Sequence, residues 1–224
     1  MLWLFGREVQ KSHGAVSHLT AKLSLVARDP ESMMASLHGT RDGAAIEIEE
    51  TLHQLRIAVE LVGWPPSVTV TPTADDTEIT GDRVFDRRFL IDGPPAHWRA
   101  VLTREIRAAL GEVFVAEASR IETGRWHAVY EDDVADGPRI HRDIERALAL
   151  ARLVTLDDTA TPHERVLAVA RAEPDAAVRA GHYHWLVDDG YPAAAVALVA
   201  ADDPDATIRA WVRDQVAPPD GAFR

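Results

Sequence analysis

The chain has 224 residues, enough for one large domain or two modest ones, each with a hydrophobic core of its own. It contains no cysteine, which excludes disulfides, thiolate metal sites and cysteine nucleophiles. This composition suits a reducing compartment, and we expect a cytoplasmic protein. The formal net charge of −12 disfavours contact with phosphate backbones, so we expect no nucleic-acid partner.

The chain shows no membrane-targeting pattern. No run approaches the roughly 18 apolar residues that a membrane span needs. The apolar residues 1–5 are too short for a signal peptide and have no basic segment before them. We interpret them as a first strand, or as the remnant of a longer upstream segment.

The first half of the chain alternates apolar and polar residues with a period of two, which is typical of half-buried strands. Short turns, such as Gly-Trp-Pro-Pro at residues 63–66, separate the runs. Before these runs the pattern is weaker, with loosely spaced apolar residues at 19–27 and a short helical run around 33–37. Strands are predicted at residues 45–49, 55–61, 68–71 and 88–91.

After Pro95 the apolar period changes to about 3.6, which predicts one amphipathic helix over residues 98–110 that packs on the sheet. Its charged stripe holds Arg99, Arg104, Glu105 and Arg107. A last strand pair is predicted around residues 113–116 and 120–130, with a turn at residues 122–124.

An acidic, turn-rich stretch at residues 131–138 is the predicted boundary between two units. Every later segment is rich in alanine and leucine and has helical periodicity. Helices are predicted at residues 140–156, 162–172, 176–188, 192–201 and 206–216.

The helical region contains an internal repeat with a spacing of 30 residues. Glu-Pro-Asp-Ala-Ala-Val-Arg-Ala at 173–180 matches Asp-Pro-Asp-Ala-Thr-Ile-Arg-Ala at 203–210. The pattern resembles the start of the second helix of a HEAT-type repeat, over about the last 60 to 80 residues. In such repeats an acidic loop residue and an arginine of successive units commonly pair, so we expect Arg179 and Arg209 to link neighbouring repeats.

The string Phe-Asp-Arg-Arg-Phe at 85–89, preceded by Thr-Gly-Asp at 80–82, is the most individual pattern of the first half. Residues 39–130 resemble an uncharacterised bacterial domain family with an F-D-x-x-F element between strands and an amphipathic helix. That family implies a fold and no activity. The functional interpretation is a polar recognition loop of Asp82, Asp86, Arg87 and Arg88. The structural alternative has Gly81 in a turn, both phenylalanines in the core and Asp86 as a cap.

Histidines suggest a metal or a catalytic base. His182 and His184, with His163 nearby, are suitable zinc ligands in principle. Residues two apart on a helix point in different directions, so we expect no metal site. Paired carboxylates, of which Asp202-Asp203 is one, lie at helix ends and are interpreted as caps.

Trp64, beside two prolines, is either buried under the sheet or exposed as an anchor for a partner. No catalytic, cofactor-binding or metal-ligating residue is assigned, and no cofactor is expected. The candidate partner-binding residues are Trp64, Asp82, Arg87, Arg88, His182 and His184.

The expected fold class is α+β. An antiparallel sheet with one packed amphipathic helix fills residues 1–134, and an all-α HEAT-like helical-hairpin unit fills residues 135–224. The first function hypothesis is a non-enzymatic interaction or scaffold protein with a protein partner. The alternative is a hydrolase or lyase with an inter-domain cleft and His182 or His184 as base. A third is a subunit of a larger membrane-peripheral or secretion-related assembly.

Overall fold

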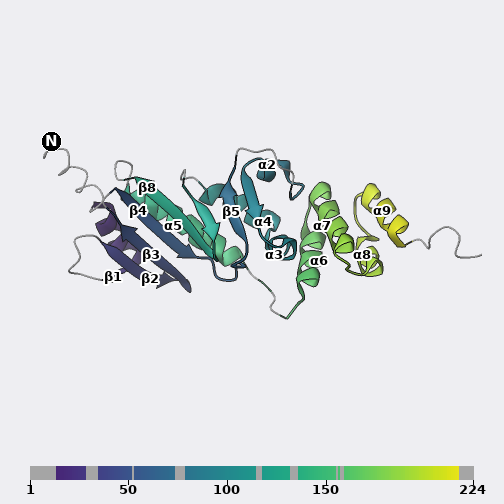
Figure 1. Cartoon of the computed structure of the whole chain (residues 1–224), viewed down its shortest axis with the longest axis horizontal. Helices are drawn as coiled ribbons and strands as arrows, with labels where there is room; N and C mark the ends of the chain where they lie inside the picture. The colour runs from purple at the N-terminus through teal and green to yellow at the C-terminus, as the bar shows by residue number, and fades with distance from the viewer. Residues whose placement is uncertain are drawn as a thin grey trace, which may run out of the picture.

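A computed structural model of the chain describes residues 14–28, 35–51, 53–73, 79–114, 118–131, 136–154, 156 and 159–216. Within these ranges the fold is α+β, as the sequence predicts. The molecule is elongated, with the sheet at one end and the last helices of the chain at the other (Figure 1). No helix of the described ranges has the length and apolar composition that a membrane span requires.

The strands pair into a single sheet in which every neighbouring pair is antiparallel. Their bounds are β1 Val26–Ala27, β2 Ser36–Arg41, β3 Ala44–Glu50, β4 Gln54–Glu60, β5 Thr69–Pro72, β6 Phe89–Asp92, β7 Arg120–Glu122 and β8 Arg125–Glu131. The spatial order is β1-β2-β3-β4-β8-β7-β5-β6. The meander expected from the sequence is therefore interrupted, because the β7-β8 hairpin lies between β4 and β5.

Alternation along the strands decides which face of the sheet is buried. In the β3-β4 ladder Ile48 opposes Ile57 and Ile46 opposes Val59, and all four side chains are buried. Each contributes about 1.5–3 kcal/mol through burial. The charged residues between them point to the opposite face, which gives the two-residue period seen in the sequence.

Two tight hairpins set the register of the sheet. The β2-β3 turn has positive φ at Asp42 and Gly43, 53° and 83°. The β7-β8 turn has positive φ at Thr123 and Gly124, 52° and 75°. Two consecutive positive φ values are the geometry of a type I′ turn, whose twist matches that of the flanking strands. The predicted turn at residues 122–124 is confirmed.

Helices cover the buried face of the sheet, and further helices form the end of the molecule away from the sheet. Residues 14–23 are helical and precede β1. The later helices are α2 Arg83–Asp86, α3 Pro95–Val101, α4 Arg104–Val113, α5 Gly137–Leu153, α6 Pro162–Ala172, α7 Ala176–Asp188, α8 Ala193–Ala200 and α9 Ala206–Val216.

Three local predictions are wrong. The single helix expected over residues 98–110 is two helices, because the chain turns at Leu102 and Thr103 caps α4 by accepting a hydrogen bond from the Ile106 amide at 3.3 Å. The strand expected around residues 113–116 begins inside α4, and residues 115–117 lie outside the described ranges. The helical run expected around residues 33–37 runs into β2, and residues 33 and 34 also lie outside the described ranges.

The buried apolar residues form two clusters. The first lies between the sheet and its helices and includes the inner side of α5, from Ile140 to Ala151. It therefore continues past residue 134, where the sequence places the unit boundary. The second fills the space between α6, α7, α8 and α9 and reaches Ala100 of α3. Helix α3 thus belongs to the sheet layer and also supports the helical stack.

Candidate functional site

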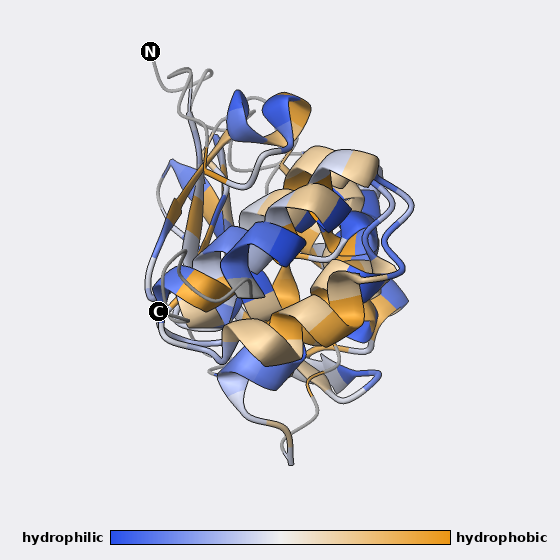
Figure 2. Cartoon of the chain, turned by 90° about the vertical axis from the view of Figure 1, so that its right-hand side faces the viewer, coloured by the Kyte–Doolittle hydropathy of each residue, from blue (hydrophilic) through white to orange (hydrophobic). Residues whose placement is uncertain are grey.

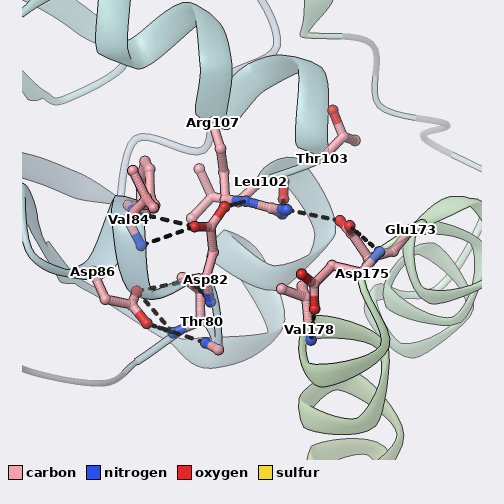
Figure 3. A network of polar contacts seen from close by, with 12 residues as sticks. Thr80, Asp82, Val84, Asp86, Leu102, Thr103, Arg107, Glu173, Asp175 and Val178 are labelled. Atoms are coloured by element: carbon pink, nitrogen blue, oxygen red, sulfur yellow. Dashed lines mark hydrogen bonds and ion pairs between the residues drawn. The ribbon is translucent and has the colours of Figure 1, made fainter.

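The predicted recognition loop is part of the contact between the sheet unit and the helical stack. Asp82 caps α2 by accepting hydrogen bonds from the amides of Val84 and Phe85 at 3.2 and 3.1 Å. It also accepts from Nε of Arg107 at 3.0 Å (Figure 3). Its carboxylate is therefore engaged by three donors of its own chain.

Asp86 holds the turn before α2 and does not face a partner. Its carboxylate is buried and accepts from the amides of Ile79, Thr80 and Gly81 and from the Thr80 hydroxyl, which lies 2.7 Å away. Figure 3 shows it pointing toward Thr80. The structural alternative for this side chain, a turn cap, is what the structure shows.

Arg87 and Arg88 remain exposed at the end of α2. Arg88 donates to the Gly111 carbonyl at 3.2 Å, and its guanidinium lies 5.2 Å from the ring centroid of Phe89. Phe89 and Phe85 are both buried, with ring centroids 4.8 Å apart. The F-D-R-R-F string therefore places both phenylalanines and Asp86 inside and both arginines at the surface.

Trp64 is buried, with 3% of its surface exposed, and its indole Nε1 donates to the Val68 carbonyl at 3.0 Å. The interpretation of Trp64 as an exposed anchor is wrong. It lines a mainly apolar groove of about 580 Å³ between the β4-β5 turn, α3 and α6. Ser67 Oγ lies 2.7 Å from His97 Nδ1 at this groove. Its described lining residues include no carboxylate, so this serine-histidine pair lacks the acid of a triad there.

His182 and His184 lie on different sides of α7. His182 is buried, and its Nδ1 is 3.4 Å from Nη1 of Arg99. His184 is exposed and stacks on Trp211 with ring centroids 4.0 Å apart. Neither imidazole contacts a carboxylate of the described residues, and these residues contain no cluster of three metal-ligating side chains. A catalytic base at His182 or His184 that is paired with a carboxylate therefore has no support. Of the histidines singled out in the sequence, the one that does pair with a carboxylate is His163, whose Nε2 lies 2.9 Å from Oδ2 of Asp189.

Burial keeps the His182 imidazole neutral. A guanidinium only donates hydrogen bonds, so Nδ1 of His182 is the acceptor for Arg99. Burial, followed by the charges of Arg99 and Arg107, lowers the pKa of His182 to about 3. Burial also lowers the pKa of Arg99 to about 10. The Arg99 guanidinium stacks over Trp98, 4.4 Å from its ring centroid, so this cation is enclosed by aromatic and imidazole rings.

A buried ion pair joins the sheet unit to the stack. Arg107 of α4 donates from Nη2 to Oε2 of Glu173, before α7, at 2.9 Å (Figure 3). Only 4% and 1% of the two side chains are exposed. Nη1 of Arg107 donates to the Leu102 carbonyl, and Oε1 of Glu173 accepts from the Asp175 amide at 3.0 Å. Both charges are thus paired and further hydrogen-bonded, as buried ions require.

A second ion pair of the same kind lies one hairpin further along. Arg179 of α7 donates from Nε and Nη2 to the two oxygens of Asp203, both at 2.9 Å. Asp203 also accepts from the Asp205 amide at 2.8 Å. The predicted inter-repeat link by Arg179 is confirmed. Asp203, interpreted from the sequence as a helix cap, is instead the buried partner of this arginine.

The two pairs obey one spacing rule, and we call each such pair a rung. The arginine is four residues after a helix N-cap, Thr103 for α4 and Asp175 for α7. The carboxylate is two residues before the N-cap of the next helix in the same layer, Asp175 for α7 and Asp205 for α9. Rungs therefore connect α4 to α7 and α7 to α9.

The same spacing holds for a third arginine, Arg209 of α9, which lies four residues after the N-cap Asp205. We call this position an open rung, because the described residues supply no carboxylate to it. Nη1 of Arg209 bonds to the Asp203 carbonyl, as Nη1 of Arg179 bonds to the Glu173 carbonyl at 2.9 Å. No carboxylate of the described residues contacts Arg209. Within the part of the chain that the structure describes, Arg209 thus bonds to the segment that enters its own helix and does not link α9 to a further repeat.

The outer side of α8 and α9, which we call the end face, is apolar along α8. This helix is Ala-Ala-Ala-Val-Ala-Leu-Val-Ala, with Val196 and Ala200 buried toward the stack. Leu198 is on the opposite side and is 81% exposed. Figure 2 views the molecule from this end and shows a helix coloured hydrophobic along its length. Helical stacks ordinarily end in a unit with a polar outer surface.

Sequence reasoning missed Arg107 and Arg99, which it placed on the charged stripe of an amphipathic helix. The only sequence signal for a rung at Arg107 is its spacing of four residues from Thr103, because the acid-Pro-Asp string that precedes α7 and α9 is absent before α4. Comparison with protein-family models, with curated proteins and with solved structures gives no match. The resemblances to a bacterial domain family and to HEAT repeats stay predictions.

Proposed function

We propose that this protein is a non-enzymatic protein-binding module whose end face meets a protein partner. The observation that carries the proposal is the exposure of Leu198 on a helix without a single polar side chain. An apolar helix at the end of a stack has the composition of an internal layer and not of a cap. A partner that covers it removes this surface from water, which stabilises the complex.

The rigid construction behind the end face supports a scaffold role. The rungs tie α9 to α7 and α7 to α4, so the end face is held in a defined position relative to the sheet. Preorganised surfaces lose less conformational entropy on binding than mobile ones. HEAT-like repeats, as proposed from the 30-residue spacing, use stacked hairpins in this manner. We place the complex in the cytoplasm, the compartment expected for a chain without cysteine.

The proposal is tested by affinity capture from the native host with the tagged full chain and quantitative mass spectrometry. Leu198→Glu puts a charge on the end face, and we expect it to remove a partner that the unchanged chain captures. Val84→Glu is the matched control, because Val84 is also an exposed apolar residue, 74% exposed, but lies on α2. A set of captured proteins that is the same for Leu198→Glu and the unchanged chain contradicts the proposal.

A further inference from the structure

The two filled rungs define which chemical group the open rung would bind. We propose that the end face binds a helix of a different protein that carries a carboxylate two residues before its N-cap, and that Arg209 is the residue that takes this carboxylate. The inference rests on the proposed function and deepens it by naming the group that the partner presents.

Arg209 is held in the orientation of an arginine that forms a rung. Its Nη1 bonds to the carbonyl of Asp203, the residue two before the N-cap of its own helix. Arg179 makes the same bond to the carbonyl of Glu173. The atoms by which Arg179 binds its carboxylate are Nε and Nη2. The corresponding atoms of Arg209 have no acceptor among the described residues, and a guanidinium binds a carboxylate best through such a pair of donors.

The carboxylate has to belong to a segment that enters a helix. In both filled rungs the carboxylate accepts from an arginine of an earlier helix, α4 for Glu173 and α7 for Asp203. It also accepts from the amide of the N-cap residue two positions later, Asp175 at 3.0 Å and Asp205 at 2.8 Å. An acidic tail without a helix behind it lacks the second donor and does not cover α8. A hairpin that begins behind an acid-Pro-Asp string satisfies both conditions.

A second copy of this chain does not offer such a carboxylate. Three acids of the described residues lie in the required position. Glu173 and Asp203 are already paired, and 1% and 2% of their side chains are exposed. Freeing either of these two requires breaking a buried rung. Asp92 lies two residues before Pro94, the N-cap of α3, and a proline has no amide hydrogen to donate to it. Because the described residues supply no free carboxylate of this kind, we infer that the partner is a different protein.

Two arginines of α9 offer donors to an acidic segment. Arg213 lies one turn after Arg209 and is exposed. Asp205 and Asp214 lie beside them on the same helix, so a carboxylate is bound here by direct pairing with Arg209 and not by a net positive charge. The apolar side of α8 then packs on the apolar side of the incoming helix.

The test uses a fluorescent synthetic peptide with the sequence of residues 161–190, the α6-α7 hairpin, which presents Glu173 to Arg107 in the intact chain. It is titrated against the full chain by fluorescence anisotropy. We expect saturable binding to the unchanged chain. We expect Arg209→Gln, or a peptide with Glu173→Gln, to weaken binding at least tenfold. Arg213→Gln removes the same charge at a position without an equivalent in the repeat, and we expect a change of less than threefold.

The arms separate this inference from the proposed function. Binding that is lost with Leu198→Glu but kept with Arg209→Gln overturns the inference and leaves the binding module standing. Absence of binding to the unchanged chain also overturns the inference, and the capture experiment then decides the proposed function alone. Equal losses for Arg209→Gln and Arg213→Gln show attraction by general charge and overturn the role of the rung.

Two other occupants are distinguished by further arms. If Asp220→Asn in the full chain strengthens peptide binding, a residue of the same chain competes for Arg209, and the proposal of a different protein fails. If analytical ultracentrifugation shows a dimer that Arg209→Gln dissociates, a second copy is the occupant and the proposal fails equally. We expect neither change.

Discussion

Gly81 lies directly against the backbone of Ala177: a Cβ atom on Gly81 would be 3.2 Å from the Ala177 carbonyl oxygen. Gly81 has a φ of +87°, a conformation that side chains disfavour. The Thr-Gly-Asp string that stands out in the sequence is therefore the place where the loop before α2 touches α7. This contact, together with the first rung, holds the sheet unit against the helical stack.

Gly81→Ala is expected to destabilise the protein more than the same change at Gly190. Both glycines have a φ of +87°, but nothing lies within 4 Å of a Cβ atom at Gly190. Gly190→Ala should cost about 1–2 kcal/mol for the backbone conformation alone. Gly81→Ala has the same backbone cost and also forces α7 away from the loop. The urea concentration at its unfolding midpoint should therefore be clearly lower than that of Gly190→Ala. Equal midpoints would show that the loop moves freely away from α7.

Removal of Arg107 or Glu173 is expected to be strongly destabilising. Arg107→Ala leaves the Glu173 carboxylate buried without its partner, and breaking a buried pair in this way costs about 3–5 kcal/mol. The free energy of unfolding is measured by urea titration. Arg104→Ala, an exposed arginine of the same helix, is the control and should change it by less than about 0.5 kcal/mol.

Arg179 and Asp203 are expected to be energetically coupled. In a double-mutant cycle with Arg179→Met and Asp203→Asn, the loss in the double variant should be smaller than the sum of the single losses by about 1–3 kcal/mol, because each single change strands a buried group. The exposed pair Arg120 and Glu122, whose side chains are 56% and 48% exposed, is the comparison. Its coupling should stay below about 1 kcal/mol. Additive effects at Arg179 and Asp203 would be inconsistent with a rung.

His182 is expected to make the protein less stable in acid. Its pKa is about 3 in the folded chain and 6.5 in the reference state, so between these values the unfolded chain binds a proton that the folded chain does not. His182 therefore leaves the free energy of unfolding unchanged above pH 6.5. As the pH decreases from 6.5 toward 3, the free energy of unfolding falls by at most about 1.4 kcal/mol per pH unit.

The measurement compares the pH dependence of urea unfolding for the unchanged chain and His182→Gln between pH 7 and pH 4. The variant should lose less stability on acidification, whatever its stability at pH 7. His184→Gln, which changes an exposed imidazole on the same helix, is the matched variant. A slope that His182→Gln leaves unchanged would mean that another group dominates the acid response.

The helices of the stack were predictable because their limits are local signals. The predicted bounds 162–172, 176–188 and 206–216 coincide with α6, α7 and α9. Thr161 forms a capping box with Glu164 before α6, and Asp175 caps α7. Such signals act within one helical turn, so the sequence contains them in full. The same holds for the strands with a two-residue period, β3 and β4.

The site was predictable only in part. The 30-residue repeat pointed to Arg179 as a link, since both partners of that rung lie within the repeat. Arg107 was assigned to a solvent-facing stripe, because its acceptor Glu173 is 66 positions away and belongs to another helix. Trp64 was left open between burial and exposure, and its hydrogen bond to Val68 settles it only in the folded chain.

By itself the sequence determined the fold class, the repeat and the limits of most helices and strands, because hydrophobic period, caps and turns depend on neighbours along the chain. Only the tertiary structure decided which charges are buried, that α5 completes the core under the sheet, and that no other described element covers Leu198 of α8 or pairs a carboxylate with Arg209. The physical reason is that burial and ion pairing depend on which elements pack together, and residues far apart in the chain supply those contacts.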